Sequence, residues 1–516
     1  MGNRTGSPSR GPLRGRDKEH GGAAGILSSA GAGLLGIVVG LALLPLVIAT
    51  IGSGAYGLWL LVSAVSVYLQ YADVGVGSAI VHFGSRSRAG VQGHTFSQYV
   101  SGGLMWNILV ATAVVPLFAV LAIFITSSNA GAAGVSSADA NALALLATLM
   151  LACLLISPFA SALVGSGLLP VERRNQSIGI AVRCAGTLTA CLAFDSIVWL
   201  AAAEVIAAIT PHAAAVIVLA RRKLLKISFR HGAFSALQKM LRYSIRSFGV
   251  ALIGATILQL GTVVVGSLMG PSDVTYYNAA FRVYTAARQL LTWIVDPFRS
   301  TLSRQFVEDP PRARRILTTL CAAAFGASAL GAGVLVFGAS GIVHLWLGAS
   351  VPTATISLTM IVLLVGFVVN AIQIPLVPAG DALGRPGAFF LIQLTWLVAF
   401  AALVFPLVSG LGIVGAALAL SAPLALIAPL YLWRARSVLE LGADDWRASG
   451  IFAIFAIVSA SAILAFGAAV IQFFAGLEPL SFYSTLTFAV SAMVFAIMLR
   501  NHLPTQRIRE LLRAKL

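Results

Sequence analysis

The chain has 516 residues, of which 59% are hydrophobic and only 10% are charged. Soluble domains carry about 25% charged residues, so this composition excludes an ordinary water-soluble protein. The net charge of +17 would suggest nucleic acid binding if the basic residues covered one soluble surface. Here they lie between apolar segments, where they report membrane topology instead, and we expect no nucleic acid partner.

The first 22 residues combine basic side chains with Gly, Ser and Pro. Such a segment cannot bury enough apolar surface to fold, so a disordered tail is predicted. The apolar run that follows is too long for the core of a signal peptide. We therefore expect it to remain attached as the first membrane helix.

Fourteen apolar segments are predicted as helices long enough to cross a ~30 Å hydrocarbon core. The predicted ranges are 24–48, 57–81, 99–126, 139–165, 175–194, 196–220, 244–268, 273–297, 315–346, 354–378, 387–408, 411–433, 450–474 and 480–499. The fold class expected is all-α, a polytopic membrane protein. No loop is long enough for a sizeable soluble domain.

The charges between these segments predict the orientation of the chain. Basic residues crowd the loops that follow the even-numbered helices, and the other loops contain only Asp139, Asp195, Asp273 and Glu478. Because cytoplasmic loops are enriched in Lys and Arg, both termini are predicted to be cytoplasmic. The location expected is the inner (plasma) membrane of a bacterium, as a multi-pass protein.

The longest basic loop divides the chain after six helices. The domains predicted are a tail at 1–22, a six-helix lobe at 23–220, a basic linker at 221–243, a second six-helix lobe at 244–433, helices 13 and 14 at 434–499, and a basic cytoplasmic tail at 500–516. A Gly-bearing turn leads to an aromatic residue in both halves, at 51–57 and at 269–277. Similar halves are typical of transporters with a site near the membrane midplane.

Four short segments carry a family resemblance: 51–59, 73–75, 277–282 with 296–298, and 382–386 with 412–417. Over 24 to about 440 the chain resembles the polysaccharide-transport flippases of the multidrug/oligosaccharidyl-lipid/polysaccharide exporter superfamily, which include O-antigen and exopolysaccharide repeat-unit flippases. The resemblance implies two six-helix lobes that work by alternating access. It also implies a polyprenyl-pyrophosphate-linked oligosaccharide as substrate, moved from the inner to the outer leaflet.

The resemblance implies membrane lipids as partners, and a polysaccharide polymerase or a chain-length regulator is a further candidate. No cofactor, metal or catalytic residue is expected. The chain has no P-loop pattern, and its seven histidines form no cluster with the spacing of metal ligands. The prediction is therefore a transporter and no enzyme.

The segment 273–297 carries a polar stripe. Its members recur at spacings of 4, 3, 4, 3 and 4, which places them on one helix face; they are Asn278, Arg282, Thr285, Gln289, Thr292 and Asp296. A helix that faced only lipid would not carry such a stripe, so it faces water or protein. Arg282 lies about 14 Å from the outer end at 1.5 Å per residue, near the midplane.

Arginines are the main candidates for substrate binding. Arg183, Arg282 and Arg288 could form a cationic central cavity for pyrophosphate, because guanidinium pairs with phosphate oxygens through two hydrogen bonds and stays protonated. The alternative is that they pair with intramembrane carboxylates or extend toward the interface. Asn370 and Gln373 could bind sugar hydroxyls, or satisfy backbone groups freed by Pro375.

Three carboxylates are candidates for ion coupling or gating. Glu204 could couple transport to a proton or sodium gradient, or act as the buried partner of Arg183. Asp73 could cap an inner gate or pair with Arg86 or Arg88, and the structural role is favoured. Asp296 is expected to form a local ion pair with Arg299.

Other functions stay open at the level of sequence. A lipid II flippase also needs a cationic cavity and is poorly separated from the leading prediction. A drug or cation exporter of the same superfamily should present cavity carboxylates, whereas the spans here carry arginines. A membrane-embedded polysaccharide polymerase or ligase should have a large outer loop, and the outer loops here are short.

Overall fold

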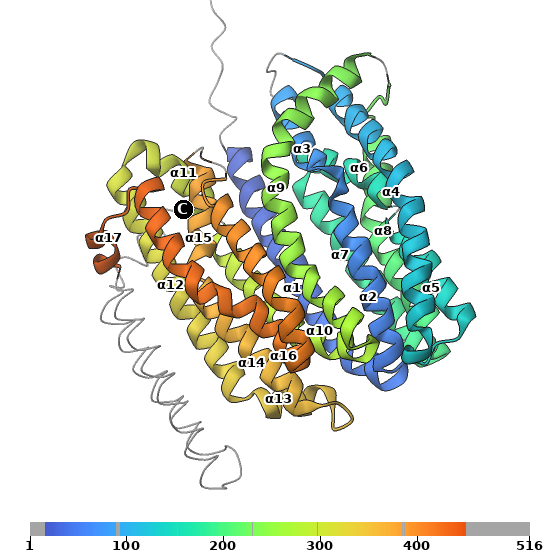
Figure 1. The fold of residues 1–516 in the computed structure, drawn as a ribbon. Helices are drawn as coiled ribbons and strands as arrows, with labels where there is room; N and C mark the ends of the chain where they lie inside the picture. The colour runs from blue at the N-terminus through green and yellow to red at the C-terminus, as the bar shows by residue number, and fades with distance from the viewer. Residues whose placement is uncertain are drawn as a thin grey trace, which may run out of the picture.

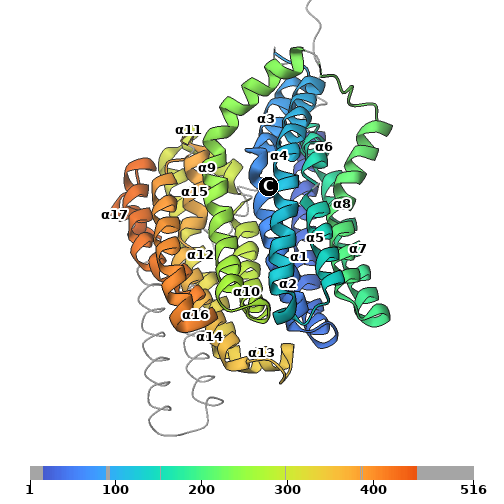
Figure 2. The same cartoon turned by 45° about the vertical axis from the view of Figure 1, so that its right-hand side comes forward.

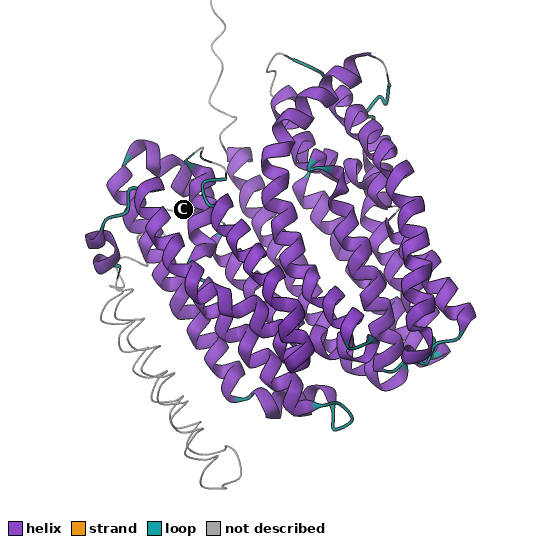
Figure 3. Cartoon of the chain, viewed as in Figure 1, coloured by secondary structure: helices purple, strands orange, loops and turns teal. Residues whose placement is uncertain are grey.

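The computed structural model describes residues 16–449 except 89–92, 152, 230, 297, 384 and 386. Over this part every element is a helix and no strand occurs (Figures 1 and 3). The predicted all-α fold is confirmed. The predicted helices 13 and 14, the C-terminal tail and most of the N-terminal tail lie outside the described residues.

The first lobe contains the six spans predicted for it. Its elements are α1 (Arg16–Thr50), α2 (Ser53–Leu69), the short 3-10 helix η1 (Gln70–Asp73), α3 (Val76–Arg88), α4 (Phe96–Ala133), α5 (Ser137–Leu151), α6 (Cys153–Gly165), α7 (Leu169–Thr189), the π-helical turn η2 (Ala190–Phe194) and α8 (Ile197–Arg221). The second predicted span is thus divided into α2, η1 and α3.

The second lobe follows after a non-helical connection at 224–229. Its elements are α9 (His231–Leu268), α10 (Pro271–Val295), α11 (Phe298–Glu308), α12 (Pro310–Phe337), α13 (Ala339–Leu347), α14 (Thr353–Asn370), α15 (Gln373–Ala382), α16 (Phe390–Val438) and α17 (Ala443–Ala448). α16 contains two predicted spans that meet at Gly412, whose φ of 61° and ψ of −140° bend the helix. Such a φ favours glycine, because it lacks a Cβ.

The described part has 9 helical segments that are long and apolar enough to cross a membrane. Many of their large apolar side chains are exposed, such as Leu117 at 72% and Phe124 at 67% on α4. Water would not tolerate such a surface, whereas lipid chains are as apolar as leucine. The chain is a multi-pass membrane protein.

Asp73 produces the break between α2 and α3. Its Oδ1 accepts a hydrogen bond from the Gly75 amide at 2.8 Å, and its Oδ2 accepts one from the Gly77 amide at 3.4 Å. Val74 and Gly75 have φ angles of 55° and 72°, which turn the chain before α3 begins. The carboxylate therefore caps the start of α3, in line with the structural role favoured for it.

The two lobes touch where α2 meets the start of α10 (Figure 2). Thr275 Oγ1 donates to the Ser53 carbonyl at 2.7 Å, and the Tyr276 hydroxyl donates to Ser53 Oγ at 3.1 Å. A side chain at Gly57 would collide with the carbonyl of Pro271. Glycine at this position therefore permits the close approach of α2 to the start of α10.

α9 packs on both lobes. Its first half lies on α4, where Gly102 approaches the backbone of Ala233, and Ser244 Oγ donates to the Gly75 carbonyl at 3.0 Å. Its second half packs on α16, where the Phe390 ring lies close to Gly249. Residues 231–243 of the basic segment 221–243, predicted as a linker, are the start of this helix.

Candidate functional site

Pro45 in α1 prepares one wall of the site. Proline has no N–H, so the carbonyl four residues earlier, that of Leu41, loses its partner within the helix. The indole N–H of Trp346 in α13 donates to this carbonyl at 2.9 Å. The neighbouring carbonyl of Gly40 accepts a hydrogen bond from Arg282 Nη1 at 2.8 Å. Two side chains of the second lobe thus dock on adjacent carbonyls of α1.

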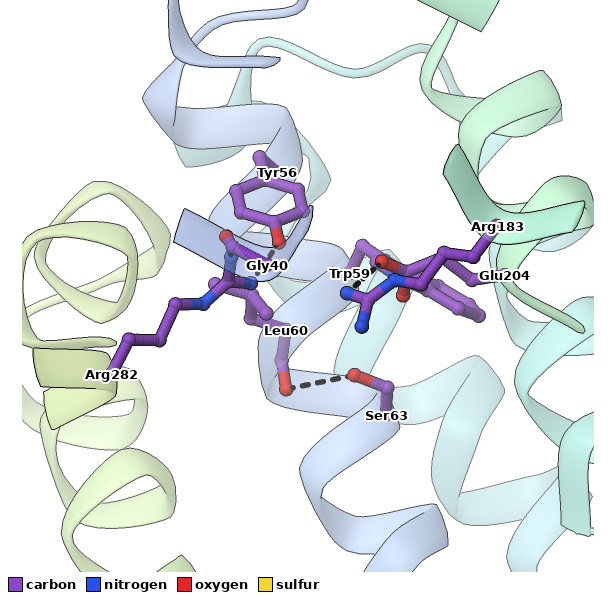
Figure 4. A network of polar contacts seen from close by, with 8 residues as sticks. All are labelled: Gly40, Tyr56, Trp59, Leu60, Ser63, Arg183, Glu204 and Arg282. Atoms are coloured by element: carbon purple, nitrogen blue, oxygen red, sulfur yellow. Dashed lines mark hydrogen bonds and ion pairs between the residues drawn. The ribbon is translucent and has the colours of Figure 1, made fainter. Parts of the chain in front are cut away.

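Arg282 lies between the lobes with neutral partners only. Its Nη1 donates to the Gly40 carbonyl, and its Nη2 donates to the hydroxyl of Tyr56. The guanidinium carbon lies 5.7 Å from the centroid of the Tyr56 ring (Figure 4). None of the ion pairs found in the described part involves Arg282. No carboxylate of the described part therefore forms a direct ion pair with this guanidinium, although Glu204 lines the same cavity.

Arg183 differs from Arg282 because Glu204 neutralises it. Arg183 Nη2 lies 2.7 Å from Glu204 Oε1, and the indole N–H of Trp59 donates to Glu204 Oε2 at 2.7 Å (Figure 4). The Glu204 side chain is 15% exposed. In this geometry Glu204 is the buried partner of Arg183, which is the structural role given above as the alternative to substrate binding by Arg183 and to ion coupling by Glu204.

These groups line one small cavity. Its polar lining consists of Tyr56, Arg183, Thr187, Glu204 and Arg282, and the rest of its wall comes from 39–47 of α1. The cavity holds about 10 Å³, which is room for at most a single water. Two guanidinium groups and one carboxylate give it a net charge of +1. The site is therefore suited to an anion, and its present volume leaves no room for a pyrophosphate.

The other predicted binding residues do not line this cavity. Asn278 donates to the carbonyl of Val274 in its own helix at 2.9 Å, and Gln289 and Asp296 are exposed. The remaining three belong to the interior side of the second lobe: Arg288 on α10, Asn370 at the end of α14 and Gln373 at the start of α15. Their roles in substrate binding stay predictions.

Four groups of the site are not among the residues predicted from the sequence: Tyr56, Trp59, Thr187 and the carbonyl of Gly40. Tyr56 and Trp59 stand in the motif segment 51–59, but both look like ordinary aromatic residues of an apolar span. The carbonyl of Gly40 leaves no side-chain signal at all. Pro45 was the available clue, because a proline inside a membrane helix frees a carbonyl for an outside partner.

Comparison with protein families gives one match. The model of a family described as "Polysaccharide biosynthesis protein" matches residues 171–349. This range contains Arg183 and Glu204 of the first lobe and Arg282 of the second. No curated protein matches the sequence.

Solved structures share the fold. The lipid II flippase MurJ in an inward closed conformation aligns with a TM-score of 0.68 at 17% identity, over 92% of this chain and 99% of MurJ. An inward-facing multidrug resistance MATE family transporter of the MOP superfamily aligns with a TM-score of 0.55 at 14% identity, over 79% of this chain and 94% of its own. A MOP superfamily transporter from Pyrococcus furiosus aligns with a TM-score of 0.59 at 14% identity, over 81% and 96%. The chain thus shares the fold of these solved transporters, and its residues 171–349 match the polysaccharide biosynthesis family, in agreement with the resemblance.

Proposed function

We propose that this protein is a flippase that moves polyprenyl-pyrophosphate-linked oligosaccharide repeat units from the cytoplasmic to the outer leaflet, for the synthesis of a surface polysaccharide. The observation that carries the proposal is the unbalanced charge of Arg282 between the two lobes. A pyrophosphate offers several anionic oxygens in the geometry that guanidinium binds best. The neutral partners of Arg282, a hydroxyl and a carbonyl, can be exchanged for such oxygens without leaving a carboxylate behind.

The size of the cavity supports alternating access. A space of about 10 Å³ cannot hold a pyrophosphate, so the lobes must separate before the substrate binds. Separation breaks the hydrogen bonds of Arg282 to Tyr56 and Gly40, because these residues belong to the opposite lobe. The same arginine that closes the site would then be free to receive the substrate.

The charge balance disfavours a cationic substrate. At an effective dielectric constant of 20, a unit charge about 4 Å from Arg282 interacts by about 4 kcal/mol. For a cationic drug this interaction is repulsive, and Glu204 is occupied by Arg183 and Trp59. A transporter of anionic lipids therefore fits the site better than a drug exporter.

Lipid II is the second candidate substrate, because the solved structure of MurJ has this fold over nearly its whole length. Lipid II and a repeat unit on its carrier share the polyprenyl pyrophosphate and differ in the sugar. The arginine site can bind both, so the sugar-binding groups decide between them. The family match to a polysaccharide biosynthesis protein favours the repeat unit.

The proposal includes a location and partners. The positive loops favour a bacterial inner membrane with both termini in the cytoplasm. A polysaccharide polymerase or a chain-length regulator is the expected partner, because flipped repeat units must be consumed at the outer face. The basic segments at the cytoplasmic face suit anionic lipid headgroups.

The test is deletion of the gene, followed by mass spectrometry of membrane polyprenyl-pyrophosphate oligosaccharides and measurement of surface glycan. The wild type, Arg282→Ala and Arg304→Ala are then returned separately; Arg304, with a side chain that is 62% exposed, is the matched control. We expect repeat units to accumulate and surface glycan to fall in the deletion strain. Arg282→Ala should restore less than about a tenth of the flux, because charged hydrogen bonds contribute about 1.5–3 kcal/mol.

Each other outcome has a meaning. If lipid II accumulates and repeat units do not, lipid II is the substrate. If both lipid pools and the surface glycan are unchanged, saccharide transport is refuted. If Arg282→Ala restores flux as well as Arg304→Ala does, the flippase proposal survives but its anion site lies elsewhere.

A further inference from the structure

A second stripe of α10 points into the second lobe. It consists of Tyr277, Phe281 and Tyr284, and Arg288 follows at the next helical position. The rings stack with centroid distances of 5.5 and 5.4 Å, and Tyr284 meets Phe367 of α14 edge-on at 6.3 Å. Helical spacing therefore directs Arg288 into this lobe, away from the cavity between the lobes.

Arg288 has no partner for its guanidinium. Within the part of the chain that the structure describes, this half-buried side chain forms neither a hydrogen bond nor an ion pair. Tyr431 of α16 lies within its electrostatic range. The Tyr431 side chain is 1% exposed, and Gln393 is a neighbour of its hydroxyl, although the two form no hydrogen bond of normal geometry.

Two amides with unused groups lie at a break beside this stripe. α14 ends at Asn370 and α15 begins at Gln373, and both helices pack on α10. The amides are 3% and 5% exposed, and neither Asn370 Nδ2 nor Gln373 Oε1 has a hydrogen-bond partner. The hydroxyl of Tyr284 is likewise buried and unpaired.

We name Tyr284, Arg288, Asn370, Gln373 and Tyr431 the second-lobe polar cluster. Buried polar groups almost always have partners, either protein or a bound water or ion. Water could satisfy the hydroxyls and the amides, but it would not balance a guanidinium that stays protonated. A cation would be repelled by the same charge, whereas an anion balances Arg288 and accepts hydrogen bonds from Asn370 Nδ2 and the hydroxyls. Gln373 Oε1 is an acceptor, so it would face water and not the anion.

We propose that the second-lobe polar cluster binds a small inorganic anion of the size and charge of chloride. Arg288 supplies the charge, and Asn370 Nδ2 with the two tyrosine hydroxyls supplies neutral donors. The anion would hold α10, α14 and α16 together inside one lobe. This site is separate from the substrate site, and the proposal does not rest on the proposed function.

The first test is thermal unfolding of the purified full chain in sodium chloride and in sodium gluconate at equal ionic strength. For the wild type, chloride should raise the unfolding midpoint and saturate, because a ligand of the folded state stabilises it by mass action. In Arg288→Gln, the chloride concentration that gives half of the stabilisation should be at least about tenfold higher than in the wild type. Arg282→Gln, in the other cavity, is the matched control and should keep the effect.

A second variant decides the matter if Arg288→Gln does not fold. Asn370→Asp places a carboxylate in the cluster, which should replace the anion, so the midpoint should be as high in gluconate as in chloride. A wild type without a saturable chloride effect would overturn the proposal. So would an effect that Arg282→Gln removes and Arg288→Gln keeps, because the anion would then bind between the lobes.

Discussion

Replacing Glu204 by glutamine keeps the shape of the side chain and removes its charge. Arg183, which lies 2.7 Å away, would then retain a cation without a counter-charge, while the amide oxygen could still accept from Trp59. Breaking a buried ion pair by neutralising one partner costs about 3–5 kcal/mol. The Arg183 side chain is 37% exposed, so solvent screens part of its charge, and we expect a loss of about 2 kcal/mol.

The assay is unfolding of the purified protein in mixed micelles with increasing sodium dodecyl sulfate. A thiol-reactive fluorophore reports it, because Cys153, Cys191 and Cys321 are buried in the folded chain. Glu204→Gln, Arg183→Gln and the double variant complete a thermodynamic cycle. The double variant should be more stable than the sum of the single losses predicts, by about 2 kcal/mol, because it leaves no unpaired charge.

An exposed ion pair provides the control. Glu440, whose side chain is 74% exposed, lies 3.3 Å from Arg314, and Glu440→Gln should change the free energy of unfolding by less than about 1 kcal/mol. If the losses at Glu204 and Arg183 add within about 0.5 kcal/mol, the two residues are not coupled. The reasoning on the neutralised arginine would then be wrong, and Arg183 would count as a free cation of the cavity.

Three further predictions follow from the contacts that hold α1, α2 and α3. Trp346→Phe removes the hydrogen bond to the Leu41 carbonyl and should cost about 1 kcal/mol in the same unfolding assay; no loss would mean that water takes over this carbonyl. Gly57→Leu should separate α2 from Pro271, so disulfide cross-linking between cysteines at the facing ends of α2 and α10 should fall, and unchanged cross-linking would contradict the close approach. Asp73→Ala removes the cap of α3 and should cost about 1 kcal/mol, whereas Asp73→Asn should be nearly neutral; equal losses would show that the charge matters more than the cap.

Apolar length and charge placement predicted where most helices of the described part run. They could not predict that the second span is divided at Asp73, or that two spans join at Gly412 without a loop. Both features depend on backbone angles that glycine permits and that hydropathy does not report. The division at Asp73 had one signal, an acidic residue followed by a glycine within an apolar run.

The polar stripe of α10 predicted that Arg282 faces water or protein, because helical spacing is regular, and in the structure Arg282 contacts the first lobe. Its partners could not be predicted, since Gly40 and Tyr56 lie 242 and 226 residues away in the sequence and one contributes only a carbonyl. Arg288 was grouped with Arg282 on charge alone. The structure directs it into the second lobe, because one third of a helical turn separates the two faces of α10.

The packing of α9 on both lobes has a consequence for exchanging parts between related proteins. A hybrid protein joined at the loop 224–229 would pair α4 from one parent with the first half of α9 from the other, and the backbone approach at Gly102 would have to be rebuilt. A junction near Gly249, inside α9, would leave each half of this helix with the surface on which it packs. The unit that can be exchanged as a whole therefore ends within a helix, and the loop 224–229 is the wrong place to divide the chain.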